Sequence, residues 1–142
     1  MEEKELMIGD WLYCSFSHEP CQLLGIELYE LTGYTFVKVT NVVGAKDIAS
    51  LSPIPLTSEI LKKNGFKNIS KELFVYYSHA ADGYIKIRLS ELLDGEWKLS
   101  VDNYDRFNDS HKQYTSDICF LKVHELQHAL RLCGIKKEIV LL

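Results

Sequence analysis

Apolar and polar positions alternate in short runs through the first third of the chain, a pattern that predicts strands rather than helices. The strands are expected at residues 10–16, 22–31, 34–43 and 47–51. Gly25 interrupts the second run, where we expect a bend or a bulge. Several short, strongly bent strands in so short a segment are typical of small barrels. The pattern therefore predicts an SH3-like small β-barrel over residues 1–52.

Two prolines mark the clearest boundary in the sequence. Pro53 and Pro55 favour an extended connector, because proline restricts its own backbone and that of the residue before it. Thr57 is a suitable helix N-cap, residues 58–64 are expected to form a short helix, and Gly65 is expected to end it. The predicted domains are residues 1–52 and residues 53–142.

Alternation returns after this helix and predicts a three-stranded antiparallel meander. Its strands are expected at residues 72–78, 84–89 and 96–101, with turns at 79–83 and 94–95. Residues 103–114 are polar and aromatic and are expected to form a loop. A helical period predicts one strong helix from Asp117 to Cys133, which Thr115 or Ser116 would cap and Gly134 would end. The expected fold class is α+β, with a barrel followed by a helix, the meander and a C-terminal helix.

Charge is spread unevenly along a chain of otherwise ordinary globular composition. The 142 residues are 46% hydrophobic and 25% charged, with a net charge of −4. Residues 1–52 hold 3 Lys and Arg against 8 Asp and Glu, whereas residues 53–142 hold 13 against 12. The acidic first part repels a phosphate backbone, which counts against nucleic acid as a partner there. A local basic patch in the second part is compatible with these numbers.

Location and redox state follow from two further features. Residues 1–5 are acidic and lack the pattern of a signal peptide, and no apolar run approaches the ~18 residues that span a bilayer. We therefore expect a cytoplasmic protein with no membrane contact. The four cysteines show no C-x-x-C spacing and are expected to be small buried hydrophobic residues. They are Cys14, Cys21, Cys119 and Cys133.

The stretch from His124 to His128 reads H-E-L-Q-H and matches the H-E-x-x-H signature of helical zinc proteases. Two histidines four residues apart share one face of a helix and can ligate zinc, while the glutamate activates a water molecule. This pattern makes His124 and His128 candidate metal ligands, with Glu125 as the candidate general base of a zinc-dependent hydrolase.

The surrounding sequence does not support a zinc site. Both histidines fall roughly 130–170° from the centre of the apolar stripe on a helical wheel. That stripe consists of Cys119, Val123, Leu126, Leu130 and Cys133. Arg131 and Gly134 stand where a metzincin would place glycine and histidine, so a third ligand is missing. We therefore predict no catalytic residue, no cofactor and no metal site, with His124 and His128 on a solvated or partner-facing side of the helix.

Two further patterns are weaker candidates for a binding site: a cluster of acidic residues and a set of aromatic residues. Asp102, Asn103, Asp105, Asn108 and Asp109 form an acidic cluster without the glycine of a Ca²⁺-binding loop, so we expect a solvated loop. Aromatic residues of the expected strands are suited to stacking on bases, although such residues more often belong to a core. The set comprises Tyr76, Tyr77, Tyr84 and Trp97.

Three sequence blocks occur in order along nearly the whole chain. The first block is Glu5–Leu12, the second is Leu51–Thr57 with Ile60, Leu61, Gly65 and Phe66, and the third is Val123–Gln127 with Leu130 and Gly134. Together they resemble a family of short proteins from Bacteroidetes and their phages. The family has no assigned activity, so the resemblance carries over no catalytic residue. Its closing helix usually has Gln at the position of Glu125 and Asn at that of His128. The resemblance thus implies that the H-E-x-x-H match is fortuitous.

The sequence as a whole favours a non-enzymatic interaction protein. A phage or mobile-element accessory factor with a protein partner fits the resemblance and the absence of an assembled catalytic set. One alternative is the zinc-dependent hydrolase based on His124, Glu125 and His128. The other is a single-stranded nucleic-acid binder that uses Tyr76, Tyr84 or Trp97 with Lys86 and Arg88.

Overall fold

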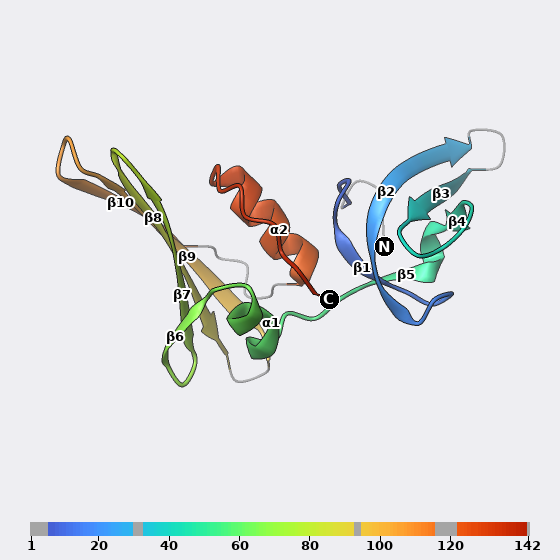
Figure 1. Ribbon diagram of the computed structural model, residues 1–142, viewed down its shortest axis with the longest axis horizontal. Helices are drawn as coiled ribbons and strands as arrows, with labels where there is room; N and C mark the ends of the chain where they lie inside the picture. Colours follow the sequence, from blue (N-terminus) through green and yellow to red (C-terminus); the bar gives the residue numbers. More distant parts are fainter. Residues whose placement is uncertain (1–5, 30–32, 93–94, 116–121, 142) are drawn as a thin grey trace. The chain divides into compact units, whose positions relative to one another are not determined.

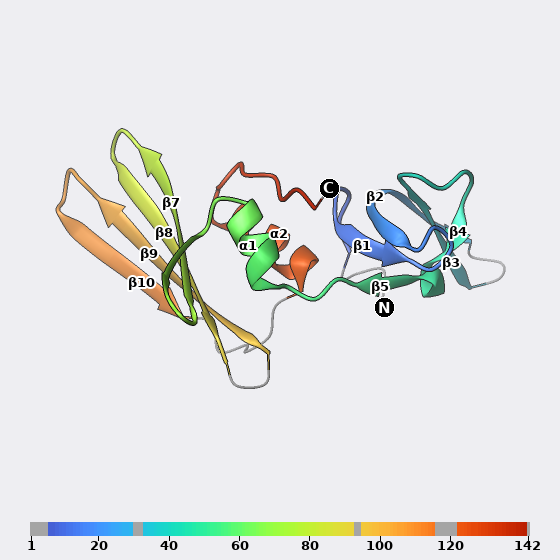
Figure 2. The ribbon, with the colours of Figure 1, turned by 60° about the horizontal axis from the view of Figure 1, so that its bottom comes forward.

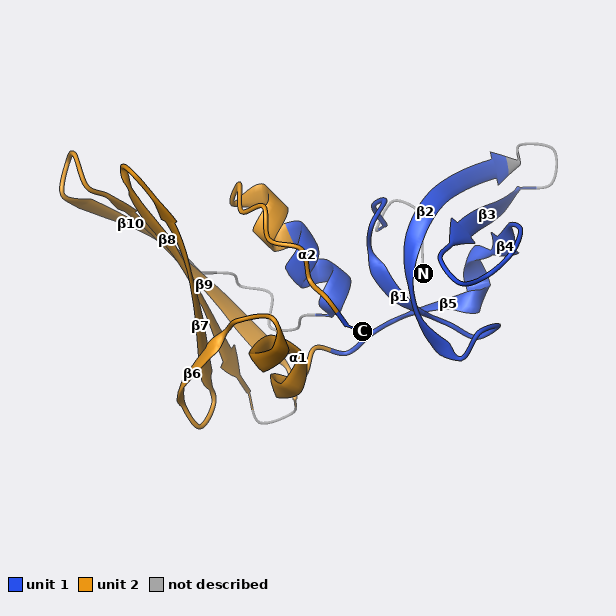
Figure 3. Ribbon diagram, in the orientation of Figure 1, with its two compact units in different colours: residues 1–55, 122–128, 141 blue, residues 56–121, 129–140, 142 orange. Residues whose placement is uncertain are grey.

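The computed structural model describes residues 6–29, 33–92, 95–115 and 122–141. The chain divides into two compact units, which Figure 3 shows in different colours. Unit 1 comprises residues 1–55, 122–128 and 141, and unit 2 comprises residues 56–121, 129–140 and 142. The division along the first part of the chain falls inside the proline-rich connector.

Unit 1 is built around a five-stranded antiparallel sheet in the order β4-β3-β2-β1-β5 (Figure 1). Its strands are β1 (Trp11–Cys14), β2 (Glu19–Tyr29), β3 (Tyr34–Val39), β4 (Lys46–Asp47) and β5 (Leu51–Pro53). The register of β2 against β3 shifts between Leu23 and Gly25, which confirms the predicted irregularity at this glycine. A 3₁₀ turn, η2 (Ile48–Ser50), precedes β5 and is capped by the Asp47 side chain.

The predicted SH3-like barrel and the α+β class are wrong. The strands at the two edges, β4 and β5, have two and three residues, and no strand pairing in the described part of the chain joins them. Edge strands this short offer few backbone hydrogen bonds with which to close a sheet on itself. The described residues form two open antiparallel sheets with two short α-helices, so the protein is mostly β.

Apolar side chains of β1, β2, β3 and β5, together with Leu6, form the core of unit 1. Its buried members are Leu6, Leu12, Cys14, Cys21, Leu23, Val37, Val39 and Leu51. Cys14 and Cys21 are fully buried free thiols, and burial raises the pKa of Cys21 to about 12. Both cysteines are therefore small buried residues, as we predicted. Cys133 is half-buried, and Cys119 lies outside the described residues.

Unit 2 contains a second five-stranded antiparallel sheet, in the order β10-β9-β8-β7-β6. Its strands are β6 (Lys67–Ser70), β7 (Leu73–Ala80), β8 (Gly83–Glu91), β9 (Trp97–Asp105) and β10 (Ser110–Thr115). The pairing of β7 with β8 and of β8 with β9 confirms the predicted meander. The predicted loop over 103–114 is wrong, because β9 continues to Asp105 and β10 pairs with it from Ser110. Strands with a face open to solvent carry polar residues there, and this composition resembled a loop.

Helix α1 (Ser58–Lys63) lies along one face of this sheet (Figure 2). The Thr57 hydroxyl accepts a hydrogen bond from the Ile60 amide at 3.3 Å, and Gly65 has a φ of +85° just after the helix. Both predicted ends of the helix are thus confirmed. The Trp97 indole donates to the Leu56 carbonyl at 2.9 Å, and its ring meets that of Phe74 at 5.6 Å between centroids. These contacts identify the core face of the sheet.

The Asn64 side chain binds the segment that follows α2, residues 135–140, within unit 2. Asn64 Nδ2 donates to the Val140 carbonyl at 2.9 Å, and Val140 N donates to Asn64 Oδ1 at 2.7 Å. Ile135 and Ile139 of the same segment are buried. This two-point contact satisfies backbone groups that have no strand partner.

The C-terminal helix α2 spans Val123–Leu132. The first part of the predicted helix, residues 117–121, and one of its two predicted caps, Ser116, lie outside the described residues. The other predicted cap, Thr115, is the last residue of β10. Gly134 follows the helix with a φ of +74°, as predicted for its end. In the described part of the chain, the helices are too short and too polar to cross a membrane.

We predict that Gly83→Ala destabilises unit 2 strongly. Gly83 has a φ of +153°, and a Cβ there would lie 1.8 Å from the Tyr104 carbonyl oxygen, so β8 would have to separate from β9. We expect a loss of about 3 kcal/mol in the free energy of unfolding, measured by urea denaturation followed by circular dichroism. Gly95→Ala is the control, because its φ is +79° but nothing lies within 4 Å. Equal losses in both variants would contradict the steric argument.

Candidate functional site

The glutamate of the H-E-L-Q-H stretch closes the first turn of α2. Glu125 Oε1 accepts a hydrogen bond from the Lys122 amide at 2.8 Å. Lys122 precedes the helix, and Glu125 is its third residue, so the contact is the glutamate half of a capping box. The negative charge also stabilises the positive end of the helix dipole. The carboxylate is therefore engaged at the start of its own helix.

The last two residues of the stretch, Gln127 and His128, contact residues 9–11 within unit 1. The Gln127 side chain accepts from the Trp11 amide at 2.8 Å and donates to the Gly9 carbonyl at 3.0 Å. His128 Nε2 lies 2.9 Å from both carboxylate oxygens of Asp10, whose residue is fully buried. The Met7 amide also donates to Asp10, at 2.7 Å. These contacts make His128 a partner of a buried carboxylate.

The predicted solvated or partner-facing position of the two histidines is wrong in this structure. Only 6% of His124 is exposed, and 23% of the His128 side chain. The wheel placed this side of the helix away from the core because it took account only of the apolar stripe. The contact between His128 and Asp10 lies on the side that the wheel assigned to solvent.

The two imidazole rings lie 5.7 Å apart at 80° to one another. Across residues 6–29, 33–92, 95–115 and 122–141, no group of three His, Cys, Asp or Glu side chains is arranged to hold a metal ion. Of the three motif residues that a zinc hydrolase needs, Glu125 caps the helix and His128 contacts Asp10. The prediction of no catalytic residue and no metal at His124 and His128 stays a prediction.

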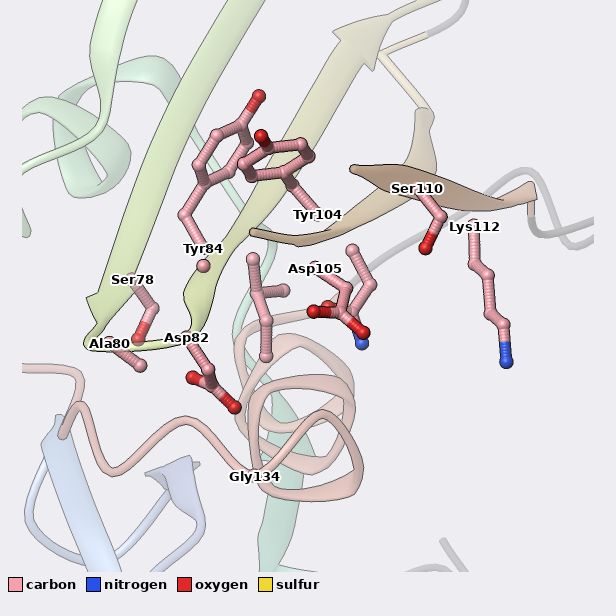
Figure 4. A pocket seen from close by; sticks show the side chains of 12 residues that line it. Ser78, Ala80, Asp82, Tyr84, Tyr104, Asp105, Ser110, Lys112 and Gly134 are labelled. Atoms are coloured by element: carbon pink, nitrogen blue, oxygen red, sulfur yellow. The ribbon is translucent and has the colours of Figure 1, made fainter. Parts of the chain in front are cut away.

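A pocket of about 410 Å³ lies on the core face of unit 2, near the ends of the β7–β8 and β9–β10 hairpins. Figure 4 shows the carboxylates of Asp82 and Asp105 on its side of the strands, together with Gly134, while the rings of Tyr84 and Tyr104 point to the other side. Asp105 accepts hydrogen bonds from the Phe107 and Asn108 amides and from the Asn108 side chain. The Asn108 side chain is the main cause that lowers the pKa of Asp105. Asp105 thus organises the β9–β10 turn.

The other members of the acidic cluster serve separate contacts. Asp109 accepts from the Tyr104 hydroxyl at 3.1 Å, and this bond is the main cause that raises the pKa of Tyr104. Asp102 lies 3.2 Å from His111 Nδ1 across the β9–β10 pair. The cluster was expected to be a solvated loop, but its residues lie on paired strands and their turn. Their carboxylates do not converge on one point.

The opposite face of the sheet carries a row of rings. His79, Tyr84, Tyr104 and His111 are directly paired with one another across β7, β8, β9 and β10. Directly paired residues of antiparallel strands place their side chains on the same face. Neighbouring ring centroids in this row are 6.1, 5.1 and 4.7 Å apart. We call this surface, together with Tyr77, the ring face.

The rings remain accessible on this face. His79 and His111 are exposed, Tyr77 is 40% exposed, and Tyr84 and Tyr104 are half-buried. Tyr77 extends the row along β7, because its ring stacks on His79 at 5.8 Å and meets Tyr84 at 5.5 Å. Contacts between rings stabilise the paired strands, and the uncovered ring surfaces are available to a ligand.

Comparisons with protein-family models, curated proteins and solved structures found no match. The functional interpretation therefore depends on the geometry of the site.

Positive charge accompanies the rings in the neighbouring rows of paired residues. Lys86 pairs with Tyr77 and Asp102, and its amine lies 5.5 Å from the centre of the Tyr77 ring. The next rows contribute further cations on the same face. They are Arg88, Lys67 and Lys98, placed by the pairs Val75–Arg88, Lys67–Val75 and Ser90–Lys98. Within these rows the four cations face one carboxylate, Asp102, and Asp109 adds a second where it accepts from the Tyr104 hydroxyl. The ring face thus keeps a positive balance although the whole chain is acidic.

The structure separates the aromatic residues that the sequence singled out. Tyr84 and Tyr77 lie on the ring face with Lys86 and Arg88. Tyr76 pairs with the buried Ile87 on the core face, and Trp97 is only 1% exposed. His79, Tyr104 and His111 were missed, because their place in one row depends on the register across three turns. Alternation carried through the hairpins would have indicated His79 and Tyr104.

We predict that Asp10 and His128 act as a pair in stability. Removal of either partner leaves the other with one fewer hydrogen bond in a partly buried site, so Asp10→Ala and His128→Ala should each cost about 2 kcal/mol. The double variant should lose less than the sum, as shown by a double-mutant cycle of urea denaturation. Glu138→Ala, in an exposed position, is the control for a change with no effect. Additive losses would show that the two side chains are energetically independent.

Proposed function

We propose that this chain is a non-enzymatic binding protein whose ring face takes polyanionic ligands. The observation that supports this most directly is the row of four rings across β7–β10, on an accessible face with cations in the adjoining rows. Accessible aromatic rings next to cations are a known means of binding polyanionic ligands.

The roles of the H-E-L-Q-H residues support the non-enzymatic part of the proposal. A zinc hydrolase needs its glutamate beside the metal-bound water and both imidazoles turned to the metal. Here the Glu125 carboxylate bonds to the Lys122 amide, and His128 Nε2 bonds to Asp10. Zinc binding would require both of these hydrogen bonds to break. The contacts of Glu125 and His128 therefore favour a structural role for the H-E-L-Q-H stretch over a catalytic one.

The charge of the ring face supports an anionic ligand. Lys86 and Arg88 are two residues apart on β8, so both side chains point from the same face of the central strand. Their fields attract phosphate or sulfate groups most strongly at low ionic strength. The expectation that nucleic acid is disfavoured came from the charge of residues 1–52, which belong to unit 1 and not to this surface. An accessory role in a phage or mobile element remains the context implied by the sequence resemblance.

Metal content tests the non-enzymatic part. Protein purified without chelator and without a polyhistidine tag should contain far less than one zinc per chain by plasma mass spectrometry, and should not hydrolyse a peptide library. Stoichiometric zinc that is lost in both His124→Ala and His128→Ala, with hydrolysis that is lost in Glu125→Gln, would overturn this part. Loss in His128→Ala alone would not suffice, because that change also removes the contact with Asp10.

Charge-neutralising variants test the binding surface. The double variant Lys86→Gln/Arg88→Gln should bind a heparin oligosaccharide about tenfold more weakly at about 50 mM salt, measured by fluorescence anisotropy. The slope of affinity against salt concentration should fall as well. The matched control is Lys62→Gln/Lys136→Gln, which removes two exposed lysines that lie outside the sheet of unit 2. Equal weakening in both pairs would assign binding to net charge and not to the ring face.

A further inference from the structure

We infer that the ligand of the ring face is single-stranded nucleic acid, with bases that stack on its tyrosines. The inference rests on the proposed anion binding of this same face and adds the chemistry of the ligand. Every base presents a flat π surface, and stacking on an exposed aromatic side chain is worth about 1–3 kcal/mol per base. Tyr77, Tyr84 and Tyr104 supply three such surfaces on adjacent strands.

The dimensions of the row suit a short stretch of nucleotides. Strands in a sheet lie about 4.8 Å apart, so the row from β7 to β10 extends about 14 Å. Four-stranded sheets that bind RNA stack about two or three bases on such a surface. The 4.7–6.1 Å between neighbouring ring centroids shows that the rings form one continuous surface and not isolated contacts.

The positions of the cations fit a backbone that runs beside the stacked bases. Lys86 lies in the row next to the rings, and Arg88 lies one row further along β8. A strand laid across the sheet with its bases on the tyrosines would place its phosphates over these rows. Asp102 lies in the Lys86 row, and His111 Nδ1 lies 3.2 Å from its carboxylate, so Asp102 has a cationic neighbour in Lys86 and a polar contact with His111.

The same features disfavour other polyanions. Duplex nucleic acid keeps the faces of its bases inside the helix, so the tyrosines could not stack on them. A sulfated polysaccharide or an acidic peptide offers charge to Lys86 and Arg88 but no array of flat rings. Only a single strand uses the rings and the cations together.

Ring-removing variants test the inference. Tyr77→Leu and Tyr104→Leu should each weaken binding of a fluorescein-labelled oligodeoxythymidylate of about 15 nucleotides at least tenfold. Both should leave heparin binding within about twofold, because the cations are unchanged. Tyr104→Phe should retain binding, since the aromatic face is kept. The matched control is Tyr13→Leu, which removes a 37% exposed tyrosine of unit 1.

Thermal unfolding of each variant shows whether the fold is retained. In the wild-type chain, NMR signals of isotope-labelled tyrosine rings report stacking directly.

Each outcome decides a different question. Loss of oligonucleotide binding in the tyrosine variants, with heparin binding kept, supports the inference. If both probes bind and neither depends on the tyrosines, anion binding stands and the inference is wrong. If duplex DNA or polyglutamate binds as tightly as the single strand, the inference is equally wrong. If no polyanion binds at low salt, both the inference and the proposed function are wrong.

Discussion

The register of the antiparallel pairs in unit 2 is the constraint on which both faces of its sheet depend. A two-residue turn joins β7 to β8 and pairs Ala80 with Gly83, so the ring row and the buried Phe74–Leu89 row are fixed together. A slip of one residue would send the rings into the core and the core residues into solvent. Gly83 protects this register, because the Tyr104 carbonyl occupies the space that a side chain would need. The proposed ligand surface and the core of unit 2 are thus set by the same few pairs.

The H-E-L-Q-H helix shows how a motif can acquire meaning from contacts distant in sequence. Its histidine and the Asp10 carboxylate are 118 residues apart, and the carboxylate has no exposure to water. Burying a carboxylate is costly unless hydrogen bonds compensate it, and the Met7 amide and His128 are two such donors. Glu125 and His128, which match a zinc-protease signature in the sequence, thus make contacts that cap α2 and hold it within unit 1.

Local signals in the sequence predicted much of the fold. Thr57 and Gly65 identified α1, and alternation identified the β7–β9 meander, because the relevant forces act between near neighbours. Strand β10 escaped prediction, since Ser110–Thr115 has no apolar alternation and is a strand only through its pairing with β9. Barrel closure was wrongly predicted because it depends on edge lengths that composition does not specify. His124 and His128 were misplaced for a similar reason, as the wheel does not include the segment from Gly9 to Trp11.

Gln127 fixes the rotation of α2 about its own axis, which the apolar stripe of the helix cannot do. Its amide accepts from Trp11 N and donates to Gly9 O, the two groups that a neighbouring peptide would bond at the edge of a strand. The side chain therefore stands in for one residue of an absent strand. Hydrophobic contacts tolerate small rotations of a helix about its axis, whereas this bidentate contact is satisfied at one rotation only. Gln127 thus sets the rotational phase of the first turns of α2 within unit 1.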